Sequence, residues 1–195
     1  FTKTQDMVAF WGHMNMISSL DKKLAFSITE CQSRFDVTLR RLDPKHFDRD
    51  VRLFLDIYNR SLVGTWGFVP ISEGETKAMA HGLKMLIVPD LTTIAEIEGK
   101  PVGAVFALLD YNPRIKEIGG RLFPFGFLRL LFNRKGLKRF RLISTNVIPE
   151  YQKWGVGLLI VSHLVPECKA WGVEEAEFSW VLESNTLSYG TLRTR

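Results

Sequence analysis

The sequence predicts an α/β domain, and three observations lead to this fold class. Strand-like and helix-like patterns alternate along most of the 195 residues. Two β-rich runs, 92–98 and 102–109, meet at a tight glycine turn. An apolar segment, 142–150, then leads through a glycine-punctuated loop into a helical pattern. With 46% hydrophobic and 24% charged residues, the composition is that of a globular domain and excludes disordered and fibrous classes.

The first elements are predicted from periodicity and capping. Residues 1–11 alternate imperfectly, as in a terminal strand, and Met16 to Phe35 places apolar residues three and four apart, as in a helical connector. Residues 35–42 indicate a strand. Asp43 and Pro44 then open a helix, because an acidic N-cap followed by proline is a typical helix start.

The later elements follow from turn chemistry. Ser72 and Glu75 have the spacing of a capping box for a helix that runs to about residue 86. The turn at residues 98–101 predicts an antiparallel hairpin. A helix after Gly155 is expected to end at Gly172, and residues 176–183 alternate as a strand.

The most informative stretch is the junction Tyr151 to Gly157, which reads Tyr-Gln-Lys-Trp-Gly-Val-Gly. The first turn of a helix leaves backbone N–H groups unpartnered, and the helix dipole adds positive charge there. Gly155 and Gly157 carry no Cβ, so we expect phosphate oxygens to approach the main chain closely. A glycine-rich turn that binds nothing is the alternative.

This junction resembles the acyl-CoA signature of the GNAT acyltransferase superfamily, written Gln/Arg-x-x-Gly-x-Gly/Ala, with Gln152, Gly155 and Gly157 at its fixed positions. The resemblance covers residues 35–185 and implies a mixed, mostly antiparallel sheet flanked by helices, truncated at the C-terminus. We therefore divide the chain into residues 1–34, a remnant of a preceding domain plus a connector, and a GNAT-like acyl-CoA-binding domain at 35–195. Residues 1–7 are similar to the closing strands of a GNAT-like unit, so a preceding GNAT-like domain in the same chain, or a homodimer, is expected.

The resemblance implies an N-acyltransferase, in particular an acetyl-CoA-dependent N-acetyltransferase, in which an amine attacks the thioester directly. The alternative is an inactive GNAT-like module that binds acyl-CoA or a partner. The co-substrate, acetyl-CoA or another acyl-CoA, is assigned to Asn146, Val147, Ile148, Gln152, Lys153, Trp154, Gly155, Val156, Gly157 and Asn185.

The catalytic residues are less clearly marked. Glu183 is the predicted general base, with Glu177 on the same strand face, and Asn146 with Thr145 as an alternative that positions a water. Tyr189 is the candidate acid, although the family places its tyrosine nearer the position of Leu192.

Two aromatic segments have alternative interpretations. Trp66 and Phe68 are predicted to shape the acceptor pocket, or else to fill the core. Residues 111–138 form a long basic and aromatic insertion, which is predicted to pack over the sheet or a neighbouring domain. Its alternatives are the wall of an acceptor pocket and a membrane-resting surface.

Other classes lack support. The four histidines and two cysteines have no metal-ligand spacing, so no metal site is expected. The net charge of +5 suits anionic ligands, but no nucleic-acid-binding motif accompanies it, so no nucleic acid is expected as a partner. No transmembrane segment is predicted, and we expect a cytoplasmic protein that acts on a small-molecule or peptide amine.

Overall fold

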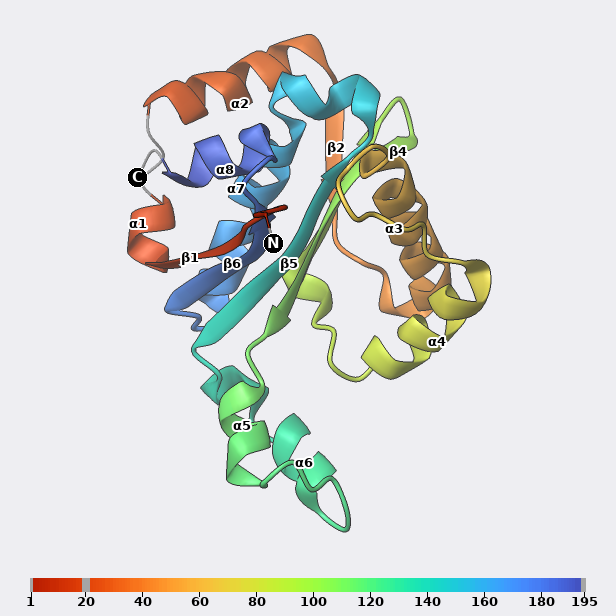
Figure 1. Ribbon diagram of the computed structural model, residues 1–195, viewed down its shortest axis with the longest axis vertical. Helices are drawn as coiled ribbons and strands as arrows, with labels where there is room; N and C mark the ends of the chain where they lie inside the picture. Colours follow the sequence, from red (N-terminus) through yellow and green to blue (C-terminus); the bar gives the residue numbers. More distant parts are fainter. Residues whose placement is uncertain (1, 19–21, 194–195) are drawn as a thin grey trace.

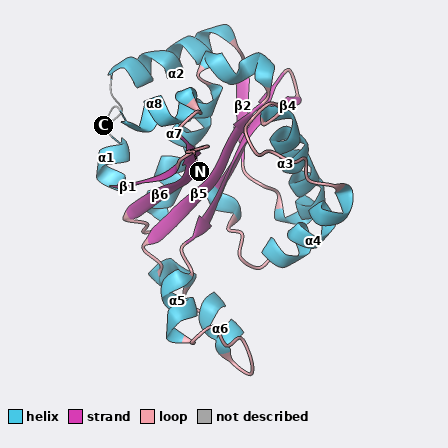
Figure 2. Ribbon diagram, in the orientation of Figure 1, coloured by secondary structure: helices cyan, strands magenta, loops and turns pink. Residues whose placement is uncertain are grey.

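The computed structural model describes residues 2–18 and 22–193, which form one six-stranded sheet with helices on both faces (Figures 1 and 2). The strands are β1 (Met7–His13), β2 (Val37–Arg40), β3 (Thr92–Ile97), β4 (Lys100–Leu109), β5 (Arg139–Val147) and β6 (Glu175–Leu182). Their order across the sheet is β1-β6-β5-β4-β3-β2. Among the described strands, β5 and β6 pair in parallel and the other neighbours are antiparallel. The predicted mixed, mostly antiparallel sheet is therefore confirmed.

Helices cover the two faces of this sheet unequally. The α-helices are α1 (Met14–Ser18), α2 (Lys22–Arg34), α3 (Phe47–Ser61), α4 (Glu73–Leu83), α5 (Asn112–Glu117), α6 (Gly126–Leu131), α7 (Val156–Ala170) and α8 (Thr186–Arg193). Short 3-10 turns are η1 (Pro44–His46), η2 (Pro89–Leu91), η3 (Arg134–Gly136) and η4 (Pro149–Trp154). Figure 1 shows α3 and α4 on one side of the sheet and α7 with α2 on the other. The buried apolar side chains form two core clusters, the larger of which contains residues of both α3 and α7.

Several local predictions are confirmed by the geometry. The hairpin between β3 and β4 turns at Glu98 and Gly99, whose φ angles of 52° and 71° are those of a two-residue turn with both residues left-handed. The Ser72 hydroxyl accepts from the N–H of Glu75, and the Glu75 carboxylate accepts from the N–H of Ser72, which is the capping box. Gly172, with φ 78°, follows the end of α7.

The N-terminal segment is part of the same sheet. β1 pairs antiparallel with β6 over Met7↔Leu182 to His13↔Glu175, and Met14 lies in the larger core cluster. The single helix expected over 16–35 is two helices, α1 and α2, and residues 19–21 between them lie outside the described residues, as does residue 1. The boundary proposed at residue 35 stays a prediction.

One expectation about strand packing was wrong, and so was one of the alternatives for the insertion. The register between β1 and β6 shifts between Val8 and Phe10, so the alternation expected along β6 breaks, and Trp180 is exposed while Ser179 and Val181 are buried. The helices of the 111–138 insertion do not lie over the sheet, although Tyr111 and Leu137 at its two ends belong to the larger core cluster. Figure 1 shows α5 and α6 extending away from the sheet and the other helices. Packing of the insertion against a neighbouring domain stays a prediction.

Candidate functional site

A wedge opens between β5 and β6, because their parallel pairing stops part-way along both strands. The register runs from Arg139↔Glu175 to Leu142↔Phe178. Beyond it, β5 continues to Val147 paired with β4, and β6 continues to Leu182 paired with β1. A bulge lies at the point of divergence, since Phe106 pairs with Ser144 and Ala107 with Leu142. The extra residue bends β5 locally, which is what a β-bulge does to its strand.

The backbone of β5 presents hydrogen-bonding groups to this wedge. The N–H of Ile148 donates to the carbonyl of Val102 at 2.9 Å. Residue pairs in an antiparallel ladder alternate between hydrogen-bonded and non-hydrogen-bonded pairs. Asn146 therefore forms backbone hydrogen bonds with β4, as Ile148 does, whereas Thr145 and Val147 direct their N–H and C=O groups away from β4. Of the three predicted backbone positions Asn146, Val147 and Ile148, Val147 therefore faces the wedge.

The predicted diphosphate loop lies between the end of β5 and α7. Gly155, with φ 80°, begins α7, and no side chain caps the first turn. The amides at this helix end thus keep the partial positive charge of the dipole. Lys153 and Trp154 are exposed, and Val156 is buried.

Side chains of the loop are held by their neighbours. The Gln152 amide donates to the carbonyls of Ser61 and Val147, both at 3.0 Å, so this side chain joins α3 to β5. The Arg34 guanidinium stacks over the Trp154 ring at 3.9 Å. Together with the buried Val156, three of the six predicted loop residues therefore use their side chains within the protein.

One of the two loop glycines also has a packing reason of its own. A Cβ on Gly155 would lie 2.6 Å from the carbonyl oxygen of Ser27 in α2. A Cβ on Gly157 would lie 3.6 Å from a Val147 methyl group in β5, which is an ordinary van der Waals distance. The missing side chain of Gly155 thus lets α2 approach the start of α7, whereas the sequence interpretation linked both glycines to phosphate.

The predicted acid and base contact the N-terminal segment. Glu183 forms an ion pair with Lys3 at 3.0 Å. Lys3 also pairs with Asp6, and the hydrogen bonds to Asp6 and, to a lesser extent, to Glu183 raise the pKa of Lys3. The Tyr189 ring packs edge-on against Phe10 of β1 at 5.8 Å. The alternative base, Glu177, pairs with Arg141 at 2.8 Å.

Asn185 is the remaining predicted cofactor residue. Its side-chain oxygen accepts from the N–H of Ser188 at 3.2 Å, which is an N-capping contact for α8. The structure thus gives Asn185 a role in starting the helix that carries Tyr189.

An apolar pocket of about 170 Å³ lies between α3, α4 and the sheet. Its lining is mostly aliphatic and aromatic and is formed by Leu42, Asp50, Val51, Phe54, Leu55, Tyr58, Ile71, Met79, Ala80, Leu83, Ile87, Thr92, Ile94, Val105, Phe106, Ile143 and Ser144. Phe68 packs edge-on against Tyr58 at 5.8 Å and so supports the wall. Trp66 is 53% exposed and is not part of the lining.

Three polar side chains connect the pocket with β5. The Asn146 amide, 2% exposed, donates to the Ser144 hydroxyl at 2.6 Å. The Ser61 hydroxyl donates to the Asn146 side-chain oxygen at 3.1 Å. Ser144 lines the pocket, so this series of side-chain hydrogen bonds connects the pocket with the strand that borders the wedge. Sequence reasoning missed both serines, because Ser61 lies 85 positions from Asn146 and no local motif marks it.

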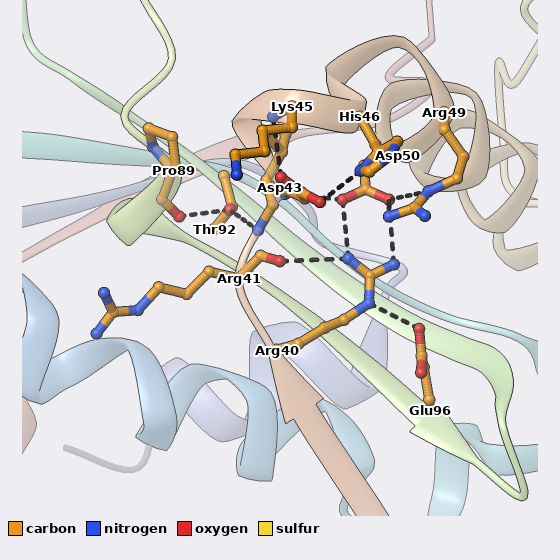
Figure 3. A network of polar contacts seen from close by, with 11 residues as sticks. Arg40, Arg41, Asp43, Lys45, His46, Arg49, Asp50, Pro89, Thr92 and Glu96 are labelled. Carbon is orange, nitrogen blue, oxygen red and sulfur yellow. Dashed lines mark hydrogen bonds and ion pairs between the residues drawn. The ribbon is translucent and has the colours of Figure 1, made fainter.

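A buried carboxylate anchors the other end of the pocket. Asp50 is fully buried. Its carboxylate accepts hydrogen bonds from both terminal guanidinium nitrogens of Arg40, from the Arg49 side chain and from the N–H of Asp43 (Figure 3). Arg40 also donates to Glu96 at 2.8 Å. Burial alone would raise the pKa of Asp50, but the bonds from Arg40, Asp43 and Arg49 together hold it below its usual value. The network joins β2, β3 and α3 and leaves Asp50 charged.

No cluster of three metal-ligating side chains occurs among the described residues. Cys31 and Cys168 are both buried as free thiols, and burial raises the pKa of Cys168 to about 12. In the described part of the chain, no helix has the length and apolarity that crossing a bilayer requires.

Comparison with known proteins gives two curated relatives. The chain is 31% identical over 192 residues to Protein YghO of Escherichia coli, covering 95% of this chain and 48% of that protein. It is 33% identical over 155 residues to the Bacterial ceramide synthase of Caulobacter vibrioides, covering 76% of this chain and 40% of that enzyme. The chain therefore spans about half the length of the curated relatives it matches or less. No protein-family model matches it.

Solved structures share the architecture. A GCN5-related N-acetyltransferase from Sphaerobacter thermophilus superimposes with a TM-score of 0.51 at 14% identity, over 80% of this chain and 40% of that one. The chain has the GNAT fold. The protein yncA from Salmonella typhimurium, solved with acetyl-CoA, superimposes with the same TM-score of 0.51 at 18% identity, over 82% of this chain and 78% of that one. Within this fold, the β5–β6 wedge opens beside the first turn of α7, and the acyl-CoA site expected there stays a prediction.

Proposed function

We propose that the chain is the acyl-CoA-binding domain of an N-acyltransferase. The observation that carries the proposal is the wedge beside β5, where Thr145 and Val147 turn backbone groups away from β4, with the uncapped first turn of α7 packed against the side chains of the same two residues. An extended pantetheine arm matches such backbone groups, and a diphosphate matches the helix terminus. The relatives with the same fold support acyl-CoA as co-substrate.

The proposed reaction is direct aminolysis of the thioester. The amine nitrogen attacks the carbonyl carbon, a C–N bond forms, the C–S bond breaks, and coenzyme A leaves with the electron pair of that bond. The amine proton passes to solvent or to the leaving sulfur. The N–H of Val147 stabilises the developing oxyanion in this scheme, and Ser144 with Asn146 orients the amine or a water.

The acceptor proposed here carries a hydrocarbon chain. A ceramide is the amide of a long-chain amine and a fatty acid, so the name of the Caulobacter relative describes an N-acylation of this type. The pocket under α3 and α4 is almost entirely apolar, with Ser144 on its wall. Its volume of about 170 Å³ is similar to cavities that hold a benzene molecule, about 150 Å³. The pocket thus suits one short segment of an alkyl chain.

The first test measures turnover. The purified protein is assayed for free thiol release from acetyl-CoA and from palmitoyl-CoA, each with ethanolamine and with sphinganine as acceptor. We expect release that depends on the amine and is fastest with sphinganine. Comparing the rates of thiol release from the two donors establishes which acyl chain length is used and tests the prediction of acetyl-CoA. The cytoplasmic location stays a prediction.

The second test examines the loop with a matched pair of charge reversals. Lys153→Glu places a carboxylate in the exposed part of the loop, and we expect coenzyme A affinity to fall by about tenfold, because like charges repel a diphosphate. Lys169→Glu makes the same change at the other end of α7 and should leave affinity unaltered. Calorimetric titration with coenzyme A measures both. Equal affinities for the two folded variants and the wild type would remove the loop assignment.

A second candidate is a domain that binds acyl-CoA without turnover. The contacts of Glu183 with Lys3 and of Tyr189 with Phe10 favour it, since both predicted catalytic side chains have structural partners. Tight coenzyme A binding without amine-dependent thiol release, for every donor and acceptor above, supports this candidate over the enzyme.

A further inference from the structure

A projecting arm, residues 112–136, exposes an unusual number of large apolar side chains. It comprises α5, the loop after it, α6 and η3. Phe123 is 84% exposed, Phe132 78% and Phe125 71%. Further exposed apolar side chains of the arm are Ile115, Leu122, Phe127 and Leu128. A contiguous apolar surface on a folded domain marks an interaction site or a liability to aggregate.

The arm is held in shape by its own contacts. The guanidinium of Arg114 on α5 donates to the carbonyls of Leu130 at 2.8 Å and Asn133 at 2.5 Å, and also to that of Phe132. It therefore satisfies carbonyls at the end of α6, which a helix terminus otherwise leaves to water. Arg129 of α6 donates to Glu117 of α5 at 3.3 Å. The apolar side chains are thus presented by two helices fixed to each other.

The arm is tied to the body at its base alone among the contacts described. The Arg134 side chain donates to the carbonyl of Met85 at 3.2 Å, and the Lys135 ammonium lies 5.7 Å from the centre of the Trp171 ring. The loop between α5 and α6 lies at the end remote from the sheet (Figure 1). A flat surface can reach this loop without meeting the sheet.

The positive charge of the arm indicates an anionic partner. Glu117 is its one acidic residue, and it is paired with Arg129. The basic residues are Arg114, Lys116, Arg121, Arg129, Arg134 and Lys135. Arg121 precedes the apolar loop directly, and Arg129 lies within α6. Aromatic side chains next to basic ones are the composition of segments that lie in the interface of an anionic bilayer, where rings enter the acyl boundary and cations meet phosphates.

We propose that this arm docks the protein on an anionic lipid bilayer. Phe123 and Phe125, in the loop between the helices, enter the headgroup region, and Arg121 and Lys116 contact lipid phosphates. The docking is peripheral, since α5 and α6 have six residues each and are far shorter than a bilayer crossing. The docking does not depend on acyl transfer, so its test is independent of the test of the proposed function.

The test is vesicle flotation with the purified protein. Vesicles of phosphatidylcholine alone are compared with vesicles that also contain phosphatidylglycerol. We expect binding to the anionic vesicles, weakened by salt and at least about tenfold weaker on neutral ones. The double variant Phe123→Ser/Phe125→Ser should lose more than about tenfold in partition coefficient. Arg121→Gln should lose about fivefold, whereas Lys169→Gln should not differ from the wild type.

A matched double variant separates the arm from general surface hydrophobicity. Phe26→Ser/Val69→Ser removes two side chains that are 65% and 77% exposed elsewhere on the molecule, and its binding should equal that of the wild type. Circular dichroism and thermal unfolding establish that all variants are folded. No flotation of the folded wild type, or equal loss in both double variants, overturns the proposal. So does a dimer in sedimentation velocity that Phe123→Ser/Phe125→Ser converts to a monomer without vesicle binding, since the arm would then dock on a second copy of the chain.

Discussion

The guanidinium of Arg40 binds both carboxylate oxygens of Asp50, at 2.8 and 3.1 Å, and Asp50 has no solvent exposure. Arg40 ends the edge strand β2, and Asp50 lies one turn into α3. The pair thus fixes the helix that forms one wall of the apolar pocket to the edge of the sheet. A bidentate geometry of this kind adds orientation as well as energy.

Asp50→Ala should destabilise the fold by about 3 kcal/mol. Removing one partner of a buried pair leaves the other uncompensated, which costs about 3–5 kcal/mol, and the partial exposure of Arg40 puts this pair at the lower end. Asp56→Ala, on the same helix, removes an exposed pair with Arg60 and should cost less than about 0.5 kcal/mol. Urea unfolding of both variants measures the difference. Equal small losses would mean that the network contributes little.

The Asp50 network should also make stability depend on pH in the acid range. The pKa of Asp50 is lower in the folded protein than in the unfolded chain, so the unfolded state binds more protons between the two values. The contribution is fully present above about pH 4, the unfolded value, and is lost as pH falls through the folded value. The stability difference between the wild type and Asp50→Asn should therefore shrink as pH falls below about 4. A difference that is constant from pH 7 to pH 2 would contradict this.

Gly155→Ala should cost about 2 kcal/mol or more. Its φ of 80° disfavours any residue with a Cβ, and the added atom would meet the Ser27 carbonyl at 2.6 Å. Gly82→Ala is the matched control, because that glycine lies in α4 with open space around it and should stabilise by about 0.5–1 kcal/mol. Thermal unfolding checks both signs. A neutral Gly155→Ala would show that α2 does not press on the loop.

Ala80→Leu should fill part of the apolar pocket and alter acceptor selectivity. The added carbons enter an existing cavity, so we expect stability to rise by about 0.5 kcal/mol or more. If an alkyl chain of the acceptor occupies the pocket, kcat/KM for sphinganine should fall while coenzyme A affinity stays the same. Ala170→Leu, at the exposed end of α7, should change neither. A stability gain with unaltered use of sphinganine would identify the pocket as an unused void.

Local elements of the fold were predictable because local chemistry specifies them. The capping box at Ser72, the hairpin at Gly99 and the helix end at Gly172 each depend on residues within a few positions. The α/β class and the β5–α7 junction followed from hydrophobic periodicity and glycine placement. The acyl-CoA loop residues were predicted from the resemblance to the GNAT signature and are contiguous in the chain, and their ligand stays a proposal.

Features that depend on contacts between distant segments could not be predicted from the sequence. That β1 forms the edge beside β6, that α2 packs on Gly155, and that Ser61 reaches Asn146 all join segments remote in sequence. The aromatic insertion differs most from what its sequence suggests. Its apolar side chains, such as Phe123, Phe125 and Phe132, favour burial, yet they are exposed to solvent. Capping and turn residues set several helix starts, helix ends and the hairpin, since those depend on short-range hydrogen bonding and backbone sterics. The helix expected over 16–35, which is two helices, is an exception. Only the packing of these elements decided which groups face the wedge, the pocket or solvent, because each depends on contacts between residues that the chain does not place near one another.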